Sequence, residues 1–225
     1  MNCPNLPVID EIVSSRGIEE VVHFTTNRGF LGCLATEHVL PRKSLRNEEL
    51  LEHILTMNAP FRTEELDSFD KSYDYLSYIN LSISEISTNL FKHSQKWHAN
   101  DDVFWVIMSF DPVLMNDAGV IFTTTNNIYS LTHRALGSVG LDSIFAPKVE
   151  RREGWAAYRR GRPAHLPTCE QAEVLYPEAL SIRYLRTVYV REGDESDIIH
   201  GMLRQYNRDD VIVRVAPGRF DGATN

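Results

Sequence analysis

The chain has 225 residues, a formal net charge of −8, 43% hydrophobic residues and 10% aromatic residues. This is the composition of a globular protein with a sizeable core, and we expect a single domain over residues 1–225. The acidic balance argues against a protein that coats nucleic acid nonspecifically, because such binding depends on many Lys and Arg contacts to phosphates. The absence of a transmembrane-length apolar run or a secretory start, together with three scattered cysteines, predicts a cytoplasmic protein with no membrane partner.

The first informative segment covers residues 18–34. Residues 18–24 have the pattern of a short buried strand, and Thr26 or Asn27 can cap a helix that follows it. The apolar side chains that this helix would turn inward are Phe30, Leu31 and Leu34. The pattern places His23 at the end of the strand, where a histidine is more often structural than functional.

The middle of the chain predicts helices and strands that do not alternate regularly. Residues 46–57 carry leucine and isoleucine at helical spacing, and the Ser-Ile-Ser-Glu sequence at 82–85 has the form of a capping box that opens a helix to about Trp97. Residues 103–110 form a nearly continuous apolar run typical of a central strand, and residues 120–124 a shorter one.

Residues 148–162 contain six basic and two acidic residues, a local charge of +4 that opposes the charge of the whole chain. The glycines within this segment argue against a continuous helix, so we expect a loop. Aromatic rings here could stack on unpaired bases while arginines hold phosphates, although a solvated charged surface explains the charges equally well. The candidate nucleic-acid-binding residues are Arg151, Arg152, Trp155, Tyr158, Arg159 and Arg160.

The carboxylate of Glu173 follows this segment, near the start of an apolar strand predicted over residues 172–176. Because side chains alternate along a strand, Gln171 and Glu173 share one face, and Glu170 falls on the other. The polar pair could face a cleft, whereas a solvated strand end is the simpler interpretation of position alone. A helix over 194–206 and a strand over 211–215 complete the predicted elements.

The usual cofactor motifs are absent from the sequence. It contains no G-x-G-x-x-G after a strand, no phosphate-binding P-loop and no H-E-x-x-H. The histidines at 93 and 98 and the three cysteines lack metal-ligand spacing, so we expect no metal. Any dinucleotide must therefore be bound without a Rossmann fingerprint.

Several short motifs together resemble the DarT family of ADP-ribosyltransferases, toxins that transfer ADP-ribose from NAD onto nucleic-acid bases. The most specific motif is the Gln-Ala-Glu strand, and the resemblance extends from about Val21 to about Arg191. The matching pieces are His23-Phe24-Thr25, Gly32, Leu40, Tyr73-Asp74-Tyr75, Ser109 to Leu114, Thr124 to Asn127 and Glu170 to Leu175.

The resemblance implies an α+β fold with a split, mostly antiparallel sheet and surrounding helices. It implies NAD as the ADP-ribose donor and Glu173 as the catalytic carboxylate, with Arg62 near the reacting base and Arg42 as a candidate for the phosphates. The residues it implies for holding NAD are His23, Phe24, Thr25, Gly32 and Leu40. It further implies a base of single-stranded DNA as the acceptor and a cognate antitoxin as a partner.

Two other functions fit the sequence. The first is the same chemistry on RNA. RNA differs from DNA by its 2′-hydroxyl, and basic and aromatic residues alone do not show whether a protein contacts that group. The second is a nucleic-acid-binding module that keeps the fold without catalysis. The presence of both His23 and Glu173 argues against this second function.

Overall fold

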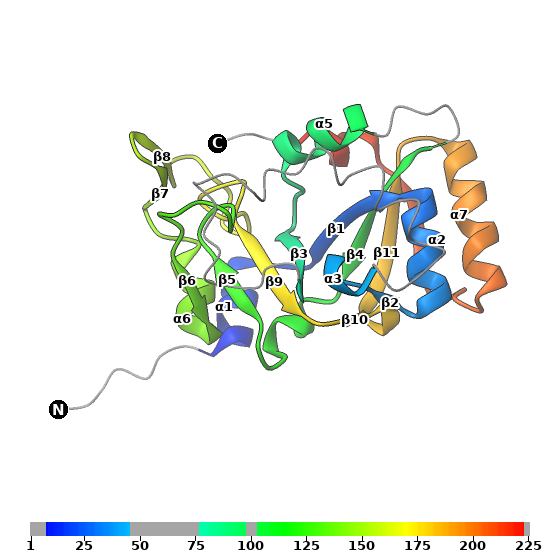
Figure 1. Cartoon of the computed structure of the whole chain (residues 1–225), viewed down its shortest axis with the longest axis horizontal. Helices are drawn as coiled ribbons and strands as arrows, with labels where there is room; N and C mark the ends of the chain where they lie inside the picture. The colour runs from blue at the N-terminus through cyan, green and yellow to red at the C-terminus, as the bar shows by residue number, and fades with distance from the viewer. Residues whose placement is uncertain (1–7, 46–76, 98–102, 223–225) are drawn as a thin grey trace.

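The computed structural model describes residues 8–45, 77–97 and 103–222. Within these residues an eight-stranded sheet has the order β12-β11-β4-β1-β3-β9-β5-β6, and its pairs are antiparallel except β11 with β12 (Figure 1). The strands are β1 (Val21–Thr26), β3 (Tyr78–Ile83), β4 (Trp105–Phe110), β5 (Ile121–Thr123), β6 (Arg134–Leu136), β9 (Glu173–Pro177), β11 (Leu185–Val190) and β12 (Ile212–Val215). The expected α+β class with a mostly antiparallel sheet is confirmed.

Smaller elements surround this sheet. Strands β2 (His38–Val39) and β10 (Leu180–Ser181) pair with each other, as do β7 (Lys148–Arg152) and β8 (Trp155–Tyr158). The α-helices are α1 (Ile9–Arg16), α2 (Asn27–Thr36), α3 (Arg42–Leu45), α5 (Thr88–Trp97), α6 (Gly137–Ser143) and α7 (Gly193–Gln205). The 3₁₀ helices are η3 (Pro112–Asn116), η4 (Ile182–Tyr184) and η5 (Pro217–Phe220).

The two faces of the sheet bury different clusters. The larger cluster packs α1, α2, α6 and α7 against one face and includes Val21 of β1. The smaller one packs α5 and η5 against the opposite face and includes Val22. Successive residues of β1 thus belong to different clusters, as the alternation of side chains along a strand requires. Covering both faces fixes β1 in the interior of the molecule.

The predicted strand and helix at 18–34 are confirmed as β1 and α2, with two corrections. Thr26 caps α2 by accepting a hydrogen bond from the Gly29 N–H at 3.1 Å, and the expected Phe30 and Leu34 are buried. Leu31 was expected to face inward but is 38% exposed, because it falls outside the stripe that faces the sheet. His23 is the third residue of β1 rather than its end, since the strand continues to Thr26.

The helix expected to open at Ser82 begins only at Thr88, so this prediction was wrong at its start. Residues up to Ile83 belong to β3, whose Ile79, Leu81 and Ile83 alternate into the core. Burial of this alternating apolar face outweighs the local capping pattern. The chain then turns at Ser84, which has a φ of 61°.

Most other predicted elements are confirmed with small shifts of their ends. The strands expected over 103–110, 120–124, 172–176 and 211–215 are β4, β5, β9 and β12, and the helix expected over 194–206 is α7. The helix expected over 46–57 and the Tyr73-Asp74-Tyr75 motif lie outside the described residues.

The basic segment is a β-hairpin rather than the expected loop. β7 and β8 pair from Lys148↔Tyr158 to Arg152↔Trp155, and Gly154 turns the chain between them with a φ of 74°. The glycine that excluded a helix is therefore a hairpin turn residue. On the inner side Val149 and Ala157 pack against Cys169, and this burial supports the pairing.

The large sheet is split between β1 and β3. β1 pairs with β4 along its whole length, from Val21↔Phe110 to Thr26↔Trp105. With β3 it shares only the register pairs Val21↔Ile83 and Val22↔Ser82, after which the two strands separate. The split expected from the resemblance is thus present, and it opens the sheet beside His23.

Candidate active site

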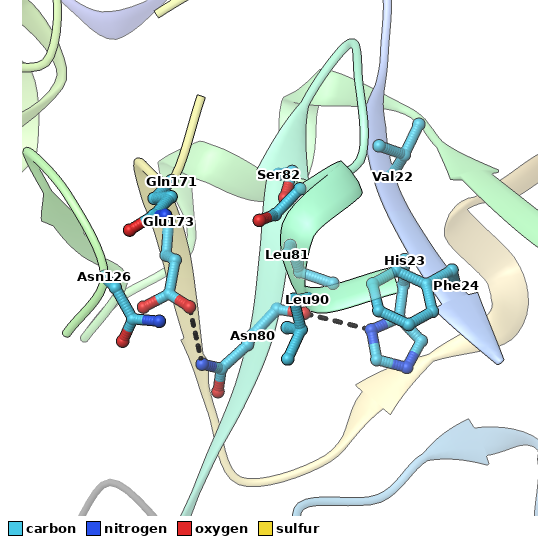
Figure 2. Close-up of a pocket in the computed structure, with 11 residues that line it drawn as sticks. Val22, His23, Phe24, Asn80, Leu81, Ser82, Leu90, Asn126, Gln171 and Glu173 are labelled. Atoms are coloured by element: carbon cyan, nitrogen blue, oxygen red, sulfur yellow. Dashed lines mark hydrogen bonds between the residues drawn. The ribbon is translucent and has the colours of Figure 1, made fainter. Parts of the chain in front are cut away.

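A pocket lies at this split (Figure 2). Its walls come from β1, β3, the start of α5, the loop after β5 and the residues that lead into β9. The side chains that matter chemically are His23, Phe24, Asn80, Asn126, Gln171 and Glu173. The pocket therefore joins the two segments that the sequence placed about 150 residues apart, at His23 and Glu173.

Glu173 is the first residue of β9 and is only 8% exposed. Its Oε1 accepts a hydrogen bond from Asn80 Nδ2 at 3.0 Å, and its Oε2 accepts one from the Asn127 backbone N–H at 2.8 Å. Its own backbone N–H donates to Thr123 Oγ1 at 3.2 Å. Both carboxylate oxygens and the main chain are thus held, which fixes the carboxylate in one orientation.

Burial raises the pKa of Glu173 to about 7, against the opposing effect of its hydrogen bonds from Asn127 and Asn80. Loss of water disfavours a carboxylate, whereas N–H donors favour it. The balance leaves the carboxylate partly ionised near neutral pH. Carboxylates with such raised pKa values in pockets are typical of catalytic sites.

The loop that supplies the Asn127 N–H is held by Arg134, at the start of β6. The Arg134 guanidinium donates to the backbone carbonyls of Asn127, Tyr129 and Thr132. It also contributes positive charge that lowers the pKa of Glu173. This arginine therefore orients a hydrogen-bond donor to Glu173 and moderates the cost of burying its charge.

His23 lies across the split from Glu173, with its Nδ1 2.9 Å from the backbone oxygen of Asn80. Because a carbonyl oxygen only accepts, this contact places the ring proton on Nδ1. Burial lowers the pKa of His23, although the hydrogen bond to Asn80 opposes the shift. The imidazole is therefore neutral at pH 7, and its Nε2 is an acceptor that a ligand hydroxyl or amide can use.

Gln171 lies two residues before Glu173 and lines the same pocket, as their shared face predicted. Its Oε1 is buried and has no hydrogen-bond partner within the described part of the chain. A buried amide oxygen without a partner costs free energy in the folded protein, so its retention in a pocket wall points to a ligand donor.

The β7–β8 hairpin is tied directly to this region. Arg151 donates to the carboxylate of Glu170 at 2.5 Å, and the two side chains are 15% and 2% exposed. Arg159 donates to the backbone oxygens of residues 163, 164 and 166, and Arg162 pairs with Glu85 before α5. These arginines hold the hairpin and the following turns against the protein.

Other side chains of the hairpin face solvent. Trp155 and Tyr158 are 58% and 56% exposed. Arg152 in the hairpin and Arg160 just after it are also exposed. The Arg152 guanidinium carbon lies 4.8 Å from the centre of the Trp155 ring. The hairpin thus presents aromatic faces and positive charge together, close in sequence to Glu173.

The described residues offer neither a metal-binding cluster nor a membrane-spanning helix. They contain no group of three or more His, Cys, Asp or Glu side chains placed to hold a metal ion. In the same part of the chain, no helix has the length and apolar character needed to cross a membrane.

A family model for the ssDNA thymidine ADP-ribosyltransferase DarT matches residues 22–221, which is nearly the whole chain. The chain belongs to the DarT family. This match confirms the expected class of enzyme, an NAD-dependent ADP-ribosyltransferase. No curated protein matches the sequence significantly.

Solved DarT structures share the fold. The Thermus sp. 2.9 DarT complex with carba-NAD+ superposes with a TM-score of 0.59 at 12% identity, covering 90% of this chain and 97% of that one. The Thermus complex with ADP-ribosylated ssDNA gives 0.60 at 12% identity, covering 90% and 96%. Thermosipho africanus DarTG in complex with ADP-ribose gives 0.56 at 12% identity, and this chain spans 51% of its length.

The NAD-holding residues expected from the DarT resemblance lie in different places. His23 and Phe24 line the pocket. Thr25 is half-buried with its hydroxyl against Gly29, in the first turn of α2. Gly32 within α2 and Leu40 after β2 do not line the pocket. Arg62 and the side chain of Arg42 lie outside the described part of the structure.

Three residues that support Glu173 were missed by sequence reasoning. No element was predicted over residues 78–81, where Asn80 lies, and the hydrogen bond from Asn127 to Glu173 Oε2 comes from a backbone N–H, which leaves no side-chain signal. Arg134 is separated from Glu173 by 39 positions and acts through a loop. Recognising residues 78–83 as a strand would have identified Asn80 as a polar residue on an otherwise alternating apolar strand.

Proposed function

We propose that this DarT-family enzyme transfers one ADP-ribose from NAD onto a base of single-stranded DNA, with Glu173 as the catalytic carboxylate. The observation that carries the proposal is the buried Glu173, held at both oxygens and facing the split that His23 borders. Thermus DarT structures with NAD+ and with ADP-ribosylated ssDNA support the choice of both substrates.

The chemistry requires a negative charge beside the ribose. Cleavage of the bond between nicotinamide and ribose develops positive charge on the sugar, which a nearby carboxylate stabilises. The ionised form of Glu173 supplies that charge, and it can also accept the proton that the attacking base releases. Its orientation by fixed N–H donors avoids reorganisation during the reaction.

The pocket offers suitable groups to NAD. The Nε2 of neutral His23 and the unpartnered Oε1 of Gln171 are both acceptors for ribose hydroxyls or the carboxamide N–H. We assign further NAD contacts to Phe24, Thr25, Gly32 and Leu40, with Arg42 as the candidate for the phosphates. Arg62 is our candidate for a second catalytic side chain near the reacting base.

The acceptor strand is assigned to the β7–β8 hairpin. Arg152 and Arg160 are exposed and can hold phosphates, whereas Trp155 and Tyr158 offer faces for unpaired bases. Arg151 and Arg159 support this surface through their bonds within the protein.

Replacement of His23 by Ala is expected to weaken NAD binding and to leave selection among oligonucleotides unchanged. The substitution removes an acceptor of the pocket without touching the hairpin. Isothermal titration calorimetry with NAD measures the affinity, and His200→Ala, on the exposed side of α7, is the matched control. Equal affinities of the wild-type and His23→Ala proteins would remove His23 from the NAD site.

Replacement of Trp155 by Ala is expected to weaken oligonucleotide binding by about 1–3 kcal/mol, the usual contribution of one stacked base. Trp155→Phe keeps an aromatic face and should retain most of the affinity. Fluorescence anisotropy with labelled single-stranded DNA measures both variants. A loss below about 0.5 kcal/mol in Trp155→Ala would show that the ring does not stack on a base.

Joint replacement of Arg152 and Arg160 by Ala is expected to reduce the salt dependence of DNA binding. Each lost phosphate contact lowers the slope of log K against log salt by about one unit. The control is Arg186→Ala with Arg214→Ala, two exposed arginines on the paired strands β11 and β12. Figure 1 shows β11 on the opposite side of the molecule from β7 and β8. Equal slopes in the hairpin variant and the wild type would place the acceptor elsewhere.

The nature of the acceptor is tested directly. Mass spectrometry of short DNA and RNA oligonucleotides incubated with the protein and NAD should show one added ADP-ribose on DNA. Modification of RNA alone would establish the same chemistry on another acceptor. Absence of any NAD consumption would instead indicate a non-catalytic nucleic-acid-binding module.

A role as the toxin of a toxin–antitoxin system follows from this activity. Modified bases damage a genome, so a cytoplasmic enzyme of this kind needs a partner that neutralises or reverses it. The similarity to Thermosipho DarTG, of which this chain spans 51%, supports an antitoxin partner.

A further inference from the structure

Asn80 contacts both functional side chains of the pocket. Its Nδ2 donates to Glu173 Oε1 at 3.0 Å, and its backbone oxygen accepts from His23 Nδ1 at 2.9 Å (Figure 2). It lies on β3, the strand between β1, which carries His23, and β9, which carries Glu173. One residue therefore connects the two sides of the split.

The separation of β1 from β3 makes the first contact possible. Continued antiparallel pairing beyond Val22↔Ser82 would bring Phe24 opposite Asn80. The strands part instead, and the His23 ring supplies the hydrogen bond that a backbone N–H of β1 would have given. The Asn80 carbonyl thereby fixes the tautomer and the position of the imidazole.

Strand register makes the second contact possible. β3 and β9 pair through Asn80↔Leu175 and Leu81↔Val174, so Glu173 is the diagonal neighbour of Asn80 on the same face. The other side chains of β3 on the opposite face, Ile79, Leu81 and Ile83, are buried in the core. This packing holds the Asn80 backbone in place.

We propose that Asn80 is a positioning residue that holds the Glu173 carboxylate and the His23 imidazole in one fixed relation. Its side chain orients the carboxylate and favours the ionised form, while its main chain orients the imidazole. The catalytic consequence rests on the function proposed above, whereas the effect of Asn80 on Glu173 does not. Deleting the Asn80 side chain should therefore change the orientation and ionisation of the Glu173 carboxylate, and it should leave the hydrogen bond between His23 and the Asn80 backbone in place.

The expected result is a change in the ionisation of Glu173. Removal of a hydrogen-bond donor to a buried carboxylate raises its pKa, and we expect a rise of about one unit in Asn80→Ala. Carbon-13 NMR of the side-chain carboxyls, with the Glu173 signal identified by its absence from Glu173→Gln, measures this pKa without NAD or DNA.

The kinetic expectation follows from the same shift. If the carboxylate must be ionised, kcat of Asn80→Ala should fall about tenfold at about pH 6 and much less at about pH 9. The KM for NAD should stay close to that of the wild type, because the backbone contact with His23 remains. A merely structural role for Asn80 would not produce this pH-dependent loss.

Asn116→Ala is the matched control. Asn116 also donates its Nδ2 to a carboxylate, Asp10 Oδ1 at 2.8 Å, but this pair lies outside the pocket. Its loss should leave the Glu173 pKa and the pH profile unchanged.

Asn80→Asp provides a second test at constant size, since its carboxylate cannot donate when ionised and repels Glu173. We expect it to raise the Glu173 pKa at least as far as Asn80→Ala does.

The outcomes separate the two proposals. An unchanged Glu173 pKa in both Asn80 variants would overturn the positioning role, whether or not the wild type transfers ADP-ribose. A raised pKa in variants of a wild type that transfers no ADP-ribose would support the positioning role and overturn the proposed function. A raised pKa with the expected pH-dependent fall in kcat would support both.

Discussion

Replacement of Glu173 by Gln is expected to reduce ADP-ribose transfer about a hundredfold to a thousandfold, the usual cost of losing a main electrostatic stabiliser of a transition state. Glutamine keeps the shape of the side chain but cannot carry the negative charge that the ribose requires. Transfer to single-stranded DNA at saturating NAD measures the effect. Retention of most activity by the folded variant would remove Glu173 from the catalytic role.

The fold of this variant can be checked through the pH dependence of its stability. The folded-state pKa of Glu173 is raised from 4.5 to about 7. Between these values the unfolded chain loses the proton while the folded protein keeps it, so the free energy of unfolding falls as pH rises. The decrease is on the order of 3 kcal/mol and is complete above about pH 7. Glu173→Gln lacks this loss and should have no lower a Tm than the wild type at about pH 8.

The same pKa predicts an acidic limb in the wild-type rate profile. If ionised Glu173 is required, kcat/KM should fall about tenfold per pH unit below about pH 7 and level off above it. The limb should be absent from the residual activity of Glu173→Gln. If the fall in rate below about pH 7 persists in this variant, it is caused by a titrating group other than Glu173.

Replacement of Arg151 by Ala is expected to destabilise the protein by about 3–5 kcal/mol, since it leaves a buried carboxylate without its partner. The Glu170 side chain is 2% exposed and pairs with Arg151 at 2.5 Å. For a protein of this size the loss corresponds to a Tm decrease of about 6–20 °C. Thermal unfolding followed by circular dichroism measures it.

The neighbouring Arg152→Ala is the control, because this arginine lies on the same strand with its side chain exposed and its guanidinium against the Trp155 ring. Its Tm should change by no more than about 2 °C. Combined replacement of Arg151 by Met and Glu170 by Leu should recover much of the lost stability, because it leaves no buried charge unpaired. Equal Tm values for Arg151→Ala and Arg152→Ala would show that the buried pair contributes nothing to folding.

Local pattern was sufficient for much of the fold. The apolar runs at 103–110 and 120–124 and the capped helix after Thr26 were predicted from periodicity and capping. The pattern failed at residues 82–85, where a capping box competes with an alternating strand. Its failure at 148–162 has a related cause, since charged and aromatic residues conceal the short Val149 and Ala157 face that Cys169 covers.

The sequence by itself identified His23, Gln171 and Glu173 as candidates for the site, but not Asn80, Asn127 or Arg134, which support the Glu173 carboxylate. Alternation along a strand is a local property, so the shared face of Gln171 and Glu173 could be derived without a structure. The individual roles of the surrounding arginines could not, because six basic residues in one segment look alike until their partners are known. The pairing of Arg151 with Glu170 comes from tertiary packing.

Only the tertiary structure decided how the site is assembled and how strongly its carboxylate resists ionisation. The pocket exists because β1 leaves β3 after Val22↔Ser82, a feature of long-range register that no local pattern records. Burial raises the pKa of Glu173, and hydrogen bonds from Asn80 and Asn127, which are distant in sequence from the carboxylate, limit the rise. Desolvation and hydrogen bonding are set by what the folded chain brings together, and these interactions determine the chemistry of Glu173.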